Sequence, residues 1–144
     1  MNFQIRECKT EDVDAIYSLN NTEMGYEYSI EDTKDKLEGL LESNKDKIFV
    51  ATVQNAVVGY VHANDYDVIY APHMKNIMGI AVSGEYKKYG IGKAMLEEIE
   101  KWAKETGAFG IRLVSGSTRT GAHEFYRRCG YIGDKQQINF KKYF

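Results

Sequence analysis

Apolar positions recur along this chain with two different periods, and the order of the two periods predicts an α/β (α+β) fold. Runs typical of strands lie at residues 3–8, 48–53, 57–63, 77–82, 111–114 and 137–144. Four segments have helical spacing, and they start near Thr10, Ser29, Ile91 and Arg119. The predicted order is strand, two helices, three strands, helix, strand, helix and strand. We therefore expect one central sheet in a single domain that spans residues 1–144.

The expected helices have recognisable ends and one apolar face each. Thr10 can cap the first helix, and Ser29 with Asp32 resembles a capping box at the start of the second. Gly107 ends the third helix, and Gly130 lies just past the fourth. The apolar faces consist of Val13, Ile16 and Tyr17; of Leu37, Leu40 and Leu41; of Ile91, Met95, Ile99 and Trp102; and of Ala122, Phe125, Tyr126 and Cys129. Residues 64–73 are expected to be irregular.

The composition fits a globular protein, with 43% hydrophobic and 28% charged residues. No apolar run exceeds six residues, so we expect no membrane-spanning segment, and the first residues lack a signal-peptide pattern. Cys8 and Cys129 have neither metal-site spacing nor a disulfide framework, so we expect no metal. These features favour a cytoplasmic protein. The absence of a lysine-rich tract argues against nucleic acid as a partner.

The charges are unevenly distributed, although the net charge is only −2. Residues 11–46 hold eleven acids and three lysines, whereas residues 119–144 hold six basic residues and two acids. Such a chain suits an anionic cofactor in its second half and a cationic acceptor near its first third. Solvated helix faces would give the same pattern without any ligand.

The segment Val82-Ser83-Gly84-Glu85-Tyr86-Lys87-Lys88-Tyr89-Gly90-Ile91-Gly92-Lys93-Ala94 predicts a phosphate site, because a basic glycine loop leads from a strand into a helix. Backbone N–H groups at a helix start bind anions, and glycine lets the ligand approach closely. A P-loop is excluded, because Lys87 and Ala94 occupy its first and last positions. A dinucleotide fingerprint is excluded by Met95. A plain turn before a surface helix remains the alternative.

Two motifs resemble those of the GNAT superfamily of acyl-CoA N-acyltransferases. Residues 87–92 resemble its glycine signature, with Lys87 in place of Gln or Arg. In residues 119–131 Ala122, Phe125-Tyr126 and Gly130-Tyr131 match a second motif in register, whereas Arg119 stands where many members have Asn. The resemblance covers nearly the whole chain.

The resemblance implies a mixed central sheet that is splayed beside the glycine loop, with helices on both faces and acetyl-CoA in the gap. It implies that the backbone of Ala81 or Val82 donates to the thioester oxygen. The residues that it assigns to the cofactor are Ile80, Ala81, Val82, Lys87, Lys88, Tyr89, Gly90, Ile91, Gly92, Lys93, Arg119 and Phe125.

Tyr126 is the residue that the resemblance assigns to catalysis. A phenol titrates near ~10 and a thiol near ~8.5, so tyrosine keeps its proton at neutral pH and can donate it to the leaving thiolate. Spacing alone would also fit a core tyrosine that packs beside Phe125 and Cys129.

The general base stays open. Several GNAT enzymes carry Glu six residues before the position of Val82, and this chain has Asn76 there. His62, His73, Asp65 and Glu27 are possible substitutes, directly or through water. The amine could also lose its proton to solvent.

The resulting hypothesis is an N-acetyltransferase in which the primary amine of a small cationic acceptor attacks acetyl-CoA directly in a ternary complex. The acceptor is expected near Glu23, Glu27 and Asp65, because they lie in or beside irregular segments. The alternatives are a non-catalytic acyl-CoA-binding module and a protein or peptide N-acetyltransferase. A homodimer and an acyl group longer than acetyl are both compatible with the sequence.

Overall fold

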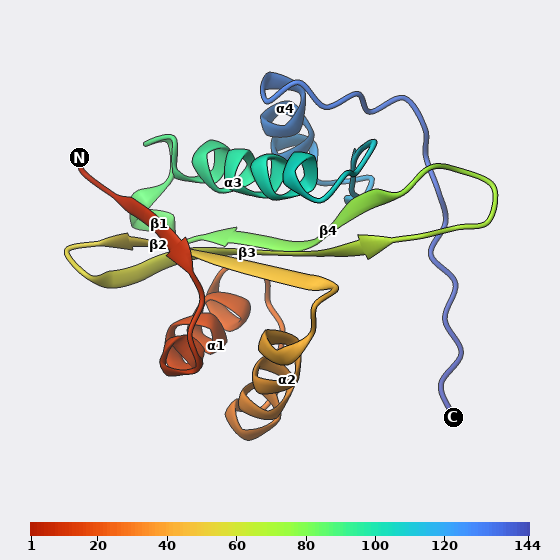
Figure 1. Ribbon diagram of the computed structural model, residues 1–144. Helices are drawn as coiled ribbons and strands as arrows, with labels where there is room; N and C mark the ends of the chain where they lie inside the picture. The colour runs from red at the N-terminus through yellow and green to blue at the C-terminus, as the bar shows by residue number, and fades with distance from the viewer. The chain divides into compact units, whose positions relative to one another are not determined.

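A five-stranded mixed sheet organises the fold, with the strands in the order β1-β2-β3-β4-β5 (Figure 1). The computed structural model describes residues 1–144, in two compact units at residues 1–113 and 114–144. The strands of the first unit are β1 (Gln4–Glu7), β2 (Asp46–Val53), β3 (Ala56–Tyr66), β4 (Met74–Val82) and β5 (Gly110–Arg112). The first four strands pair antiparallel, and β5 pairs parallel with β4. The predicted mixed α/β class is confirmed.

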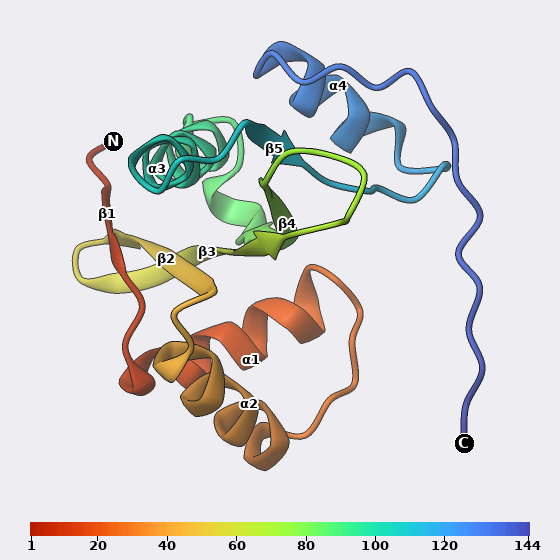
Figure 2. The ribbon, with the colours of Figure 1, turned by 45° about the vertical axis from the view of Figure 1, so that its right-hand side comes forward.

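Helices cover both faces of this sheet, as Figures 1 and 2 show. Helices α1 (Val13–Thr22) and α2 (Ile30–Glu42) lie on one face, and α3 (Ile91–Glu105) lies on the other. Side chains of a strand alternate between faces, so in β3 Tyr60 belongs to the α1 and α2 side and Val61 to the α3 side. The core of the first face contains Cys8, Ile16, Leu19, Leu37, Ile48, Val50, Tyr60 and Ala81. On α3 the buried residues are Ile91, Met95, Leu96, Ile99 and Ala103.

The two helix starts in the first third differ from each other. Ser29 caps α2 as predicted, because its Oγ accepts the N–H of Asp32 at 3.1 Å. Thr10 does not cap α1. It opens a short 3₁₀ helix, η1 (Thr10–Asp12), and the carboxylate of Asp12 accepts from both Arg6 and the backbone N–H of Lys9, each at 2.8 Å. A partly buried ion pair with β1 thus replaces the predicted hydroxyl cap.

The sheet opens between β4 and β5. Their pairing covers only the first three residues of β4, with Asn76 and Arg112 on the last rung. The backbone of residues 77–82 has no strand partner on that side. The strand predicted at 111–114 is therefore shorter and begins at Gly110. The predicted opening of the sheet beside the glycine loop is confirmed.

The second unit contains α4 (Thr120–Arg128) and an extended segment after it. The strand predicted at residues 137–144 is wrong, because these residues form no strand. Alternation in the sequence, such as that of Ile138 and Phe140, does not create a strand, since its N–H and C=O groups need a partner strand. Both of these side chains are exposed.

The irregular segment predicted at residues 64–73 is also too long, because β3 runs to Tyr66.

Candidate active site

The glycine loop leads from β4 into α3 through two residues in the left-handed region. Lys88 has φ 70° and Gly90 has φ 85°, and Gly90 occupies the N-cap of α3. The first intrahelical bond runs from Ala94 N–H to the carbonyl of Gly90 at 3.0 Å. The N–H groups of the preceding helical residues, 91–93, have no helical acceptor. No acid and no side-chain cap lies at this helix start, so its positive dipole end suits an anionic ligand.

The end of β4 presents backbone donors beside this loop. Ser83 N–H donates to the carbonyl of Val58 at 2.8 Å, toward β3. Successive residues of a strand point their N–H groups to opposite sides, so the N–H groups of Val82 and Ile80 point away from β3, to the side where β5 no longer pairs. The carbonyl of Ala81 faces β3, because a Cβ added at Gly59 would lie 2.9 Å from it. This geometry favours Val82 over Ala81 as a donor to a thioester oxygen.

Glu23, which the sequence assigned to the acceptor, lies against the glycine loop. Its Oε2 accepts the N–H of Gly84 at 3.2 Å, and its Oε1 lies 3.2 Å from Nζ of Lys87. The Glu23 side chain is largely buried, whereas that of Lys87 is 58% exposed. The structure thus joins the end of α1 to the glycine loop through this carboxylate.

A hollow of about 430 Å³ follows α1 on the same side of the sheet, and it includes Glu27. Its lining residues are Asn20, Tyr26, Glu27 and Tyr28. A second hollow, also of about 430 Å³, shares Tyr28 with the first. Its other lining residues are Asp32, Asp35, Lys36, Gly39 and Leu40. Carboxylates and exposed aromatic rings in one concave surface suit an ammonium group.

Tyr60 connects this hollow to β4. Its hydroxyl donates to Oδ1 of Asn20, and a Cβ added at Gly79 would lie 3.6 Å from that hydroxyl. Burial, and then the neighbouring Tyr26, raises the pKa of Tyr60 to about 12. Tyr60 therefore stays protonated and holds Asn20 in place. Gly79 directly precedes Ile80, so the hollow lies close to the open edge of β4.

One candidate for the general base, His62, lies on this face together with Asn76, and both side chains have partners. His62, the partner of Gly79 across β3 and β4, has its Nε2 2.7 Å from Oδ1 of Asp46. Asn76, at the position where some family members have Glu, accepts a hydrogen bond from Nη1 of Arg112 at 2.5 Å. The base position of the resemblance is thus neutral and bound to a cation.

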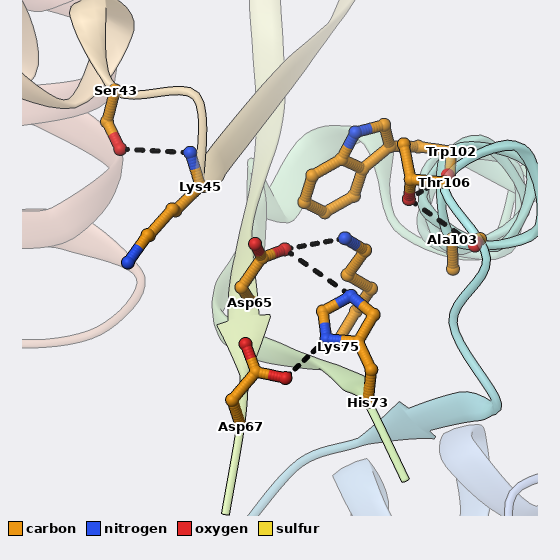
Figure 3. Close-up of polar contacts among 9 residues, drawn as sticks. All are labelled: Ser43, Lys45, Asp65, Asp67, His73, Lys75, Trp102, Ala103 and Thr106. Atoms are coloured by element: carbon orange, nitrogen blue, oxygen red, sulfur yellow. Dashed lines mark hydrogen bonds and ion pairs between the residues drawn. The ribbon is translucent and has the colours of Figure 1, made fainter.

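Asp65 and His73 lie on the opposite face, beside α3 (Figure 3). Asp65 Oδ1 lies 2.5 Å from Nζ of the buried Lys75, which sits 4.1 Å from the ring centroid of Trp102. His73 lies between the carboxylates of Asp65 and Asp67, at 3.7 and 2.7 Å. The structure therefore does not bring Asp65 together with Glu27.

The second unit carries the remaining predicted residues. Tyr126 is partly buried in α4, with its ring centroid 5.3 Å from that of Phe125. Burial raises the pKa of Tyr126, which Arg119 opposes and Cys129 reinforces. Arg119 is exposed at the N-cap of α4. The phenol is thus kept protonated at neutral pH.

The acetyltransferase (GNAT) family model matches residues 13–131 of this chain. The chain belongs to the GNAT family. The predicted family is confirmed, and a GNAT acetyltransferase uses acetyl-CoA as its acetyl donor, as predicted. A comparison with curated proteins found no match.

Solved structures with the GNAT fold superpose over the whole chain. An aminoglycoside acetyltransferase from an uncultured soil metagenomic sample, in complex with trehalose, has a TM-score of 0.86 at 22% identity, covering 99% of this chain and 96% of its own. AAC(6')-Iy, bound to a CoA-containing bisubstrate analog, has a TM-score of 0.88 at 14% identity and full coverage of both chains. The aminoglycoside 6'-N-acetyltransferase AAC(6')-Ih of Acinetobacter baumannii has a TM-score of 0.86 at 16% identity, with 99% of each chain covered. These likenesses confirm the fold.

Sequence reasoning missed the residues that line or support the hollow, namely Asn20, Tyr26, Tyr28 and Tyr60, and it missed Arg112. Tyr26 and Tyr28 flank Glu27 in a loop, and this aromatic pair could have drawn attention to it. None of the helices combines the length and apolar character needed to cross a bilayer.

Proposed function

We propose that this GNAT protein transfers an acetyl group from acetyl-CoA to the primary amine of a small acceptor that is cationic at that amine. One observation carries the proposal: the uncapped start of α3, which suits an anion, follows the unpaired edge of β4 by one glycine loop. If the diphosphate binds to the N–H groups of residues 91–93, the thioester end of acetyl-CoA would lie along this edge of β4. The basic side chains of the loop, Lys87, Lys88 and Lys93, add positive charge around the diphosphate.

The chemistry is a direct transfer. The amine nitrogen forms a bond to the thioester carbon, the C–S bond breaks, and the amine proton leaves to a base or to solvent. The N–H groups of Ile80 and Val82 would stabilise charge on the carbonyl oxygen. Tyr126 would give its proton to the CoA thiolate.

The acceptor amine is assigned to the hollow beside Tyr60. An ammonium there would meet the carboxylate of Glu27 and the faces of Tyr26 and Tyr28. The solved neighbours that act on aminoglycosides support an amine acceptor of this kind. His62, oriented by Asp46, is the best-placed protein group to take the proton, through water.

The test is release of free thiol from acetyl-CoA, screened across polyamines, aminoglycosides, amino acids and short peptides. An active amine would support the proposal, and mass spectrometry of the product would locate the acetyl group. Tight acetyl-CoA binding without turnover of any amine would instead favour a non-catalytic acyl-CoA-binding module, for which the neutral Asn76 is the specific argument.

A further inference from the structure

Arg112 lies where the sheet opens. It is the last residue of β5 and shares the last rung of the β4–β5 pairing with Asn76. Asn76 in turn pairs with Asn64 of β3. In β3 Tyr60, Asn64 and Tyr66 alternate onto the same face, so Arg112 and Asn76 belong to the α1 and α2 side of the sheet, like the hollow. This is the side from which the proposed acceptor approaches the thioester.

The contacts of Arg112 hold its guanidinium without neutralising it. Nη1 donates to Oδ1 of Asn76 at 2.5 Å, and Cζ lies 4.2 Å from the ring centroid of Tyr66. Both partners are uncharged. The other cations of the first unit that are buried or partly buried have carboxylate partners: Arg6 has Asp12, Lys47 has Glu7 and Lys75 has Asp65. Arg112 thus differs from them, because its charge has no counterpart among its contacts.

A guanidinium in this setting is suited to bind a carboxylate. Arginine presents five N–H donors in a planar fork that matches both oxygens of a carboxylate. The Asn76 bond and the Tyr66 ring fix the plane of the fork and use only one of these donors. Because a partly buried charge is unfavourable without a counterion, binding of an anion to Arg112 would be favourable in free energy.

We infer that Arg112 binds a carboxylate of the acceptor, so that the acceptor is a short peptide or peptide-like molecule with a free amine and a free carboxylate. This inference rests on the proposed function. The distance along β4 sets the length of the acceptor. Asn76 and Ile80 are four residues apart, which is about 13 Å in a regular strand and somewhat less across the bulge between them. An extended chain spans ~3.3–3.6 Å per residue, which corresponds to two to four residues.

The test compares triglycine with triglycine amide, which keeps the amine and lacks the carboxylate. With the full-length protein and saturating acetyl-CoA, we expect kcat/KM to be at least ~10-fold higher for the acid, about 1.4 kcal/mol. Arg112→Gln should lower kcat/KM for the acid by a similar factor and leave the amide within ~2-fold. Asn76→Asp, which puts a competing carboxylate on the guanidinium, should lower the ratio of kcat/KM for the acid to kcat/KM for the amide. Arg128→Gln removes an exposed arginine of α4 and is the matched control.

Two results would overturn the inference. The first is a wild-type protein that acetylates acid and amide equally well. The second is an Arg112→Gln variant that loses activity equally on both, with a lower melting temperature, since Arg112 would then only brace the edge of the sheet.

Failure of the proposed function gives a different result, because no amine would then release thiol. In that case calorimetric titration of N-acetyl-triglycine in the presence of CoA still decides the site. Binding that Arg112→Gln weakens at least ~10-fold would support the carboxylate site. Binding that is absent, or that Arg112→Gln leaves unchanged, would refute it.

Discussion

The hydroxyl of Tyr126 is kept protonated by its surroundings in α4. Burial raises its pKa above the ordinary value of 10.0, against the opposing effect of Arg119. A group that must give a proton acts only below its pKa, so this shift widens the pH range in which Tyr126 can serve as an acid. At the same scale Glu23 contacts the glycine loop, because its carboxylate accepts the N–H of Gly84 and pairs with Lys87.

We predict that Tyr126→Phe retains acetyl-CoA affinity and loses roughly 10²-fold in kcat, the usual scale for a general acid. In the wild-type protein the ionisation of Tyr126 should leave kcat unchanged through neutral pH. It should lower kcat only in the alkaline range, as the pH rises through the raised pKa of Tyr126. The variant should lack this alkaline fall. Thiol-release kinetics across pH measure both effects, with Tyr143→Phe, an exposed phenol, as the control. Unchanged turnover would make Tyr126 a packing residue.

A second prediction separates the charge of Glu23 from its hydrogen bond. Glu23→Gln keeps an acceptor for the Gly84 N–H and releases Lys87 for the diphosphate, so it should tighten acetyl-CoA binding by roughly 2- to 5-fold, the scale of an exposed ion pair. Glu23→Ala loses both contacts and should bind more weakly than Glu23→Gln. Calorimetry decides, and equal affinities in the two variants would contradict the role of the hydrogen bond.

At the scale of elements, α3 combines a packing face with an N-terminal end that suits an anionic ligand. Ile91, Met95, Leu96 and Ile99 are essentially fully buried, which fixes the helix on the sheet. Its first turn is left with free N–H groups, because Gly90 offers no side-chain cap. By contrast α2 begins with the Ser29 cap and the acids Glu31 and Asp32. The two helix starts are therefore chemically opposite, and only that of α3 suits an anion.

We predict that Gly92→Leu weakens acetyl-CoA binding at least ~10-fold, about 1.4 kcal/mol, because a side chain in the first turn of α3 would block the approach of the diphosphate. Gly39→Leu is the matched control, because it is also a helical glycine and an added Cβ there meets nothing within 4 Å. Calorimetric titration gives the affinities. A folded Gly92→Leu variant with wild-type affinity would refute the diphosphate assignment.

At the scale of the whole molecule, the acidic and the basic residues are concentrated in different parts of the chain. The acids of residues 11–46 include Glu27 of the hollow, whereas the glycine loop carries Lys87 and Lys88. An ammonium would be attracted to the first region and a diphosphate to the second. The net charge of −2 conceals this separation.

We predict that kcat/KM for a cationic acceptor such as triglycine amide falls as salt rises, because exposed charges are screened within ~8–10 Å at physiological ionic strength. Glu27→Gln should raise KM for this acceptor and leave acetyl-CoA affinity unchanged. Glu38→Gln, an exposed acid of α2, should change neither. Initial-rate kinetics at several salt concentrations provide the measurement. If kcat/KM is independent of salt and of Glu27, the acidic segment is only a solvated surface.

The sequence by itself determined what depends on near neighbours in the chain. The Ser29 cap acts over three residues, and the amphipathic face of α3 and the glycine loop before it are contiguous. Such patterns predicted the helices and the resemblance to the family, and the resemblance implied the opening of the sheet beside the loop. The sequence also predicted a strand at residues 137–144 and a cap at Thr10, and both were wrong. In the first case the alternating pattern does not provide a partner strand. In the second case the carboxylate of Asp12 accepts a hydrogen bond from Arg6 of β1 instead.

Only the tertiary structure decided which distant side chains meet. The Tyr60 hydroxyl reaches Asn20 across 40 residues, Arg112 reaches Asn76 across 36, and Glu23 reaches Gly84 across 61. The register of β3 with β4, including its bulge, also places Asp65 beside α3 and Tyr60 beside α1. A shift of one residue in a strand reverses the face of every side chain, and that register is set by pairing and packing across the whole sheet. The local pattern therefore predicted a phosphate site at the glycine loop, whereas the surroundings proposed for the acceptor required the folded sheet.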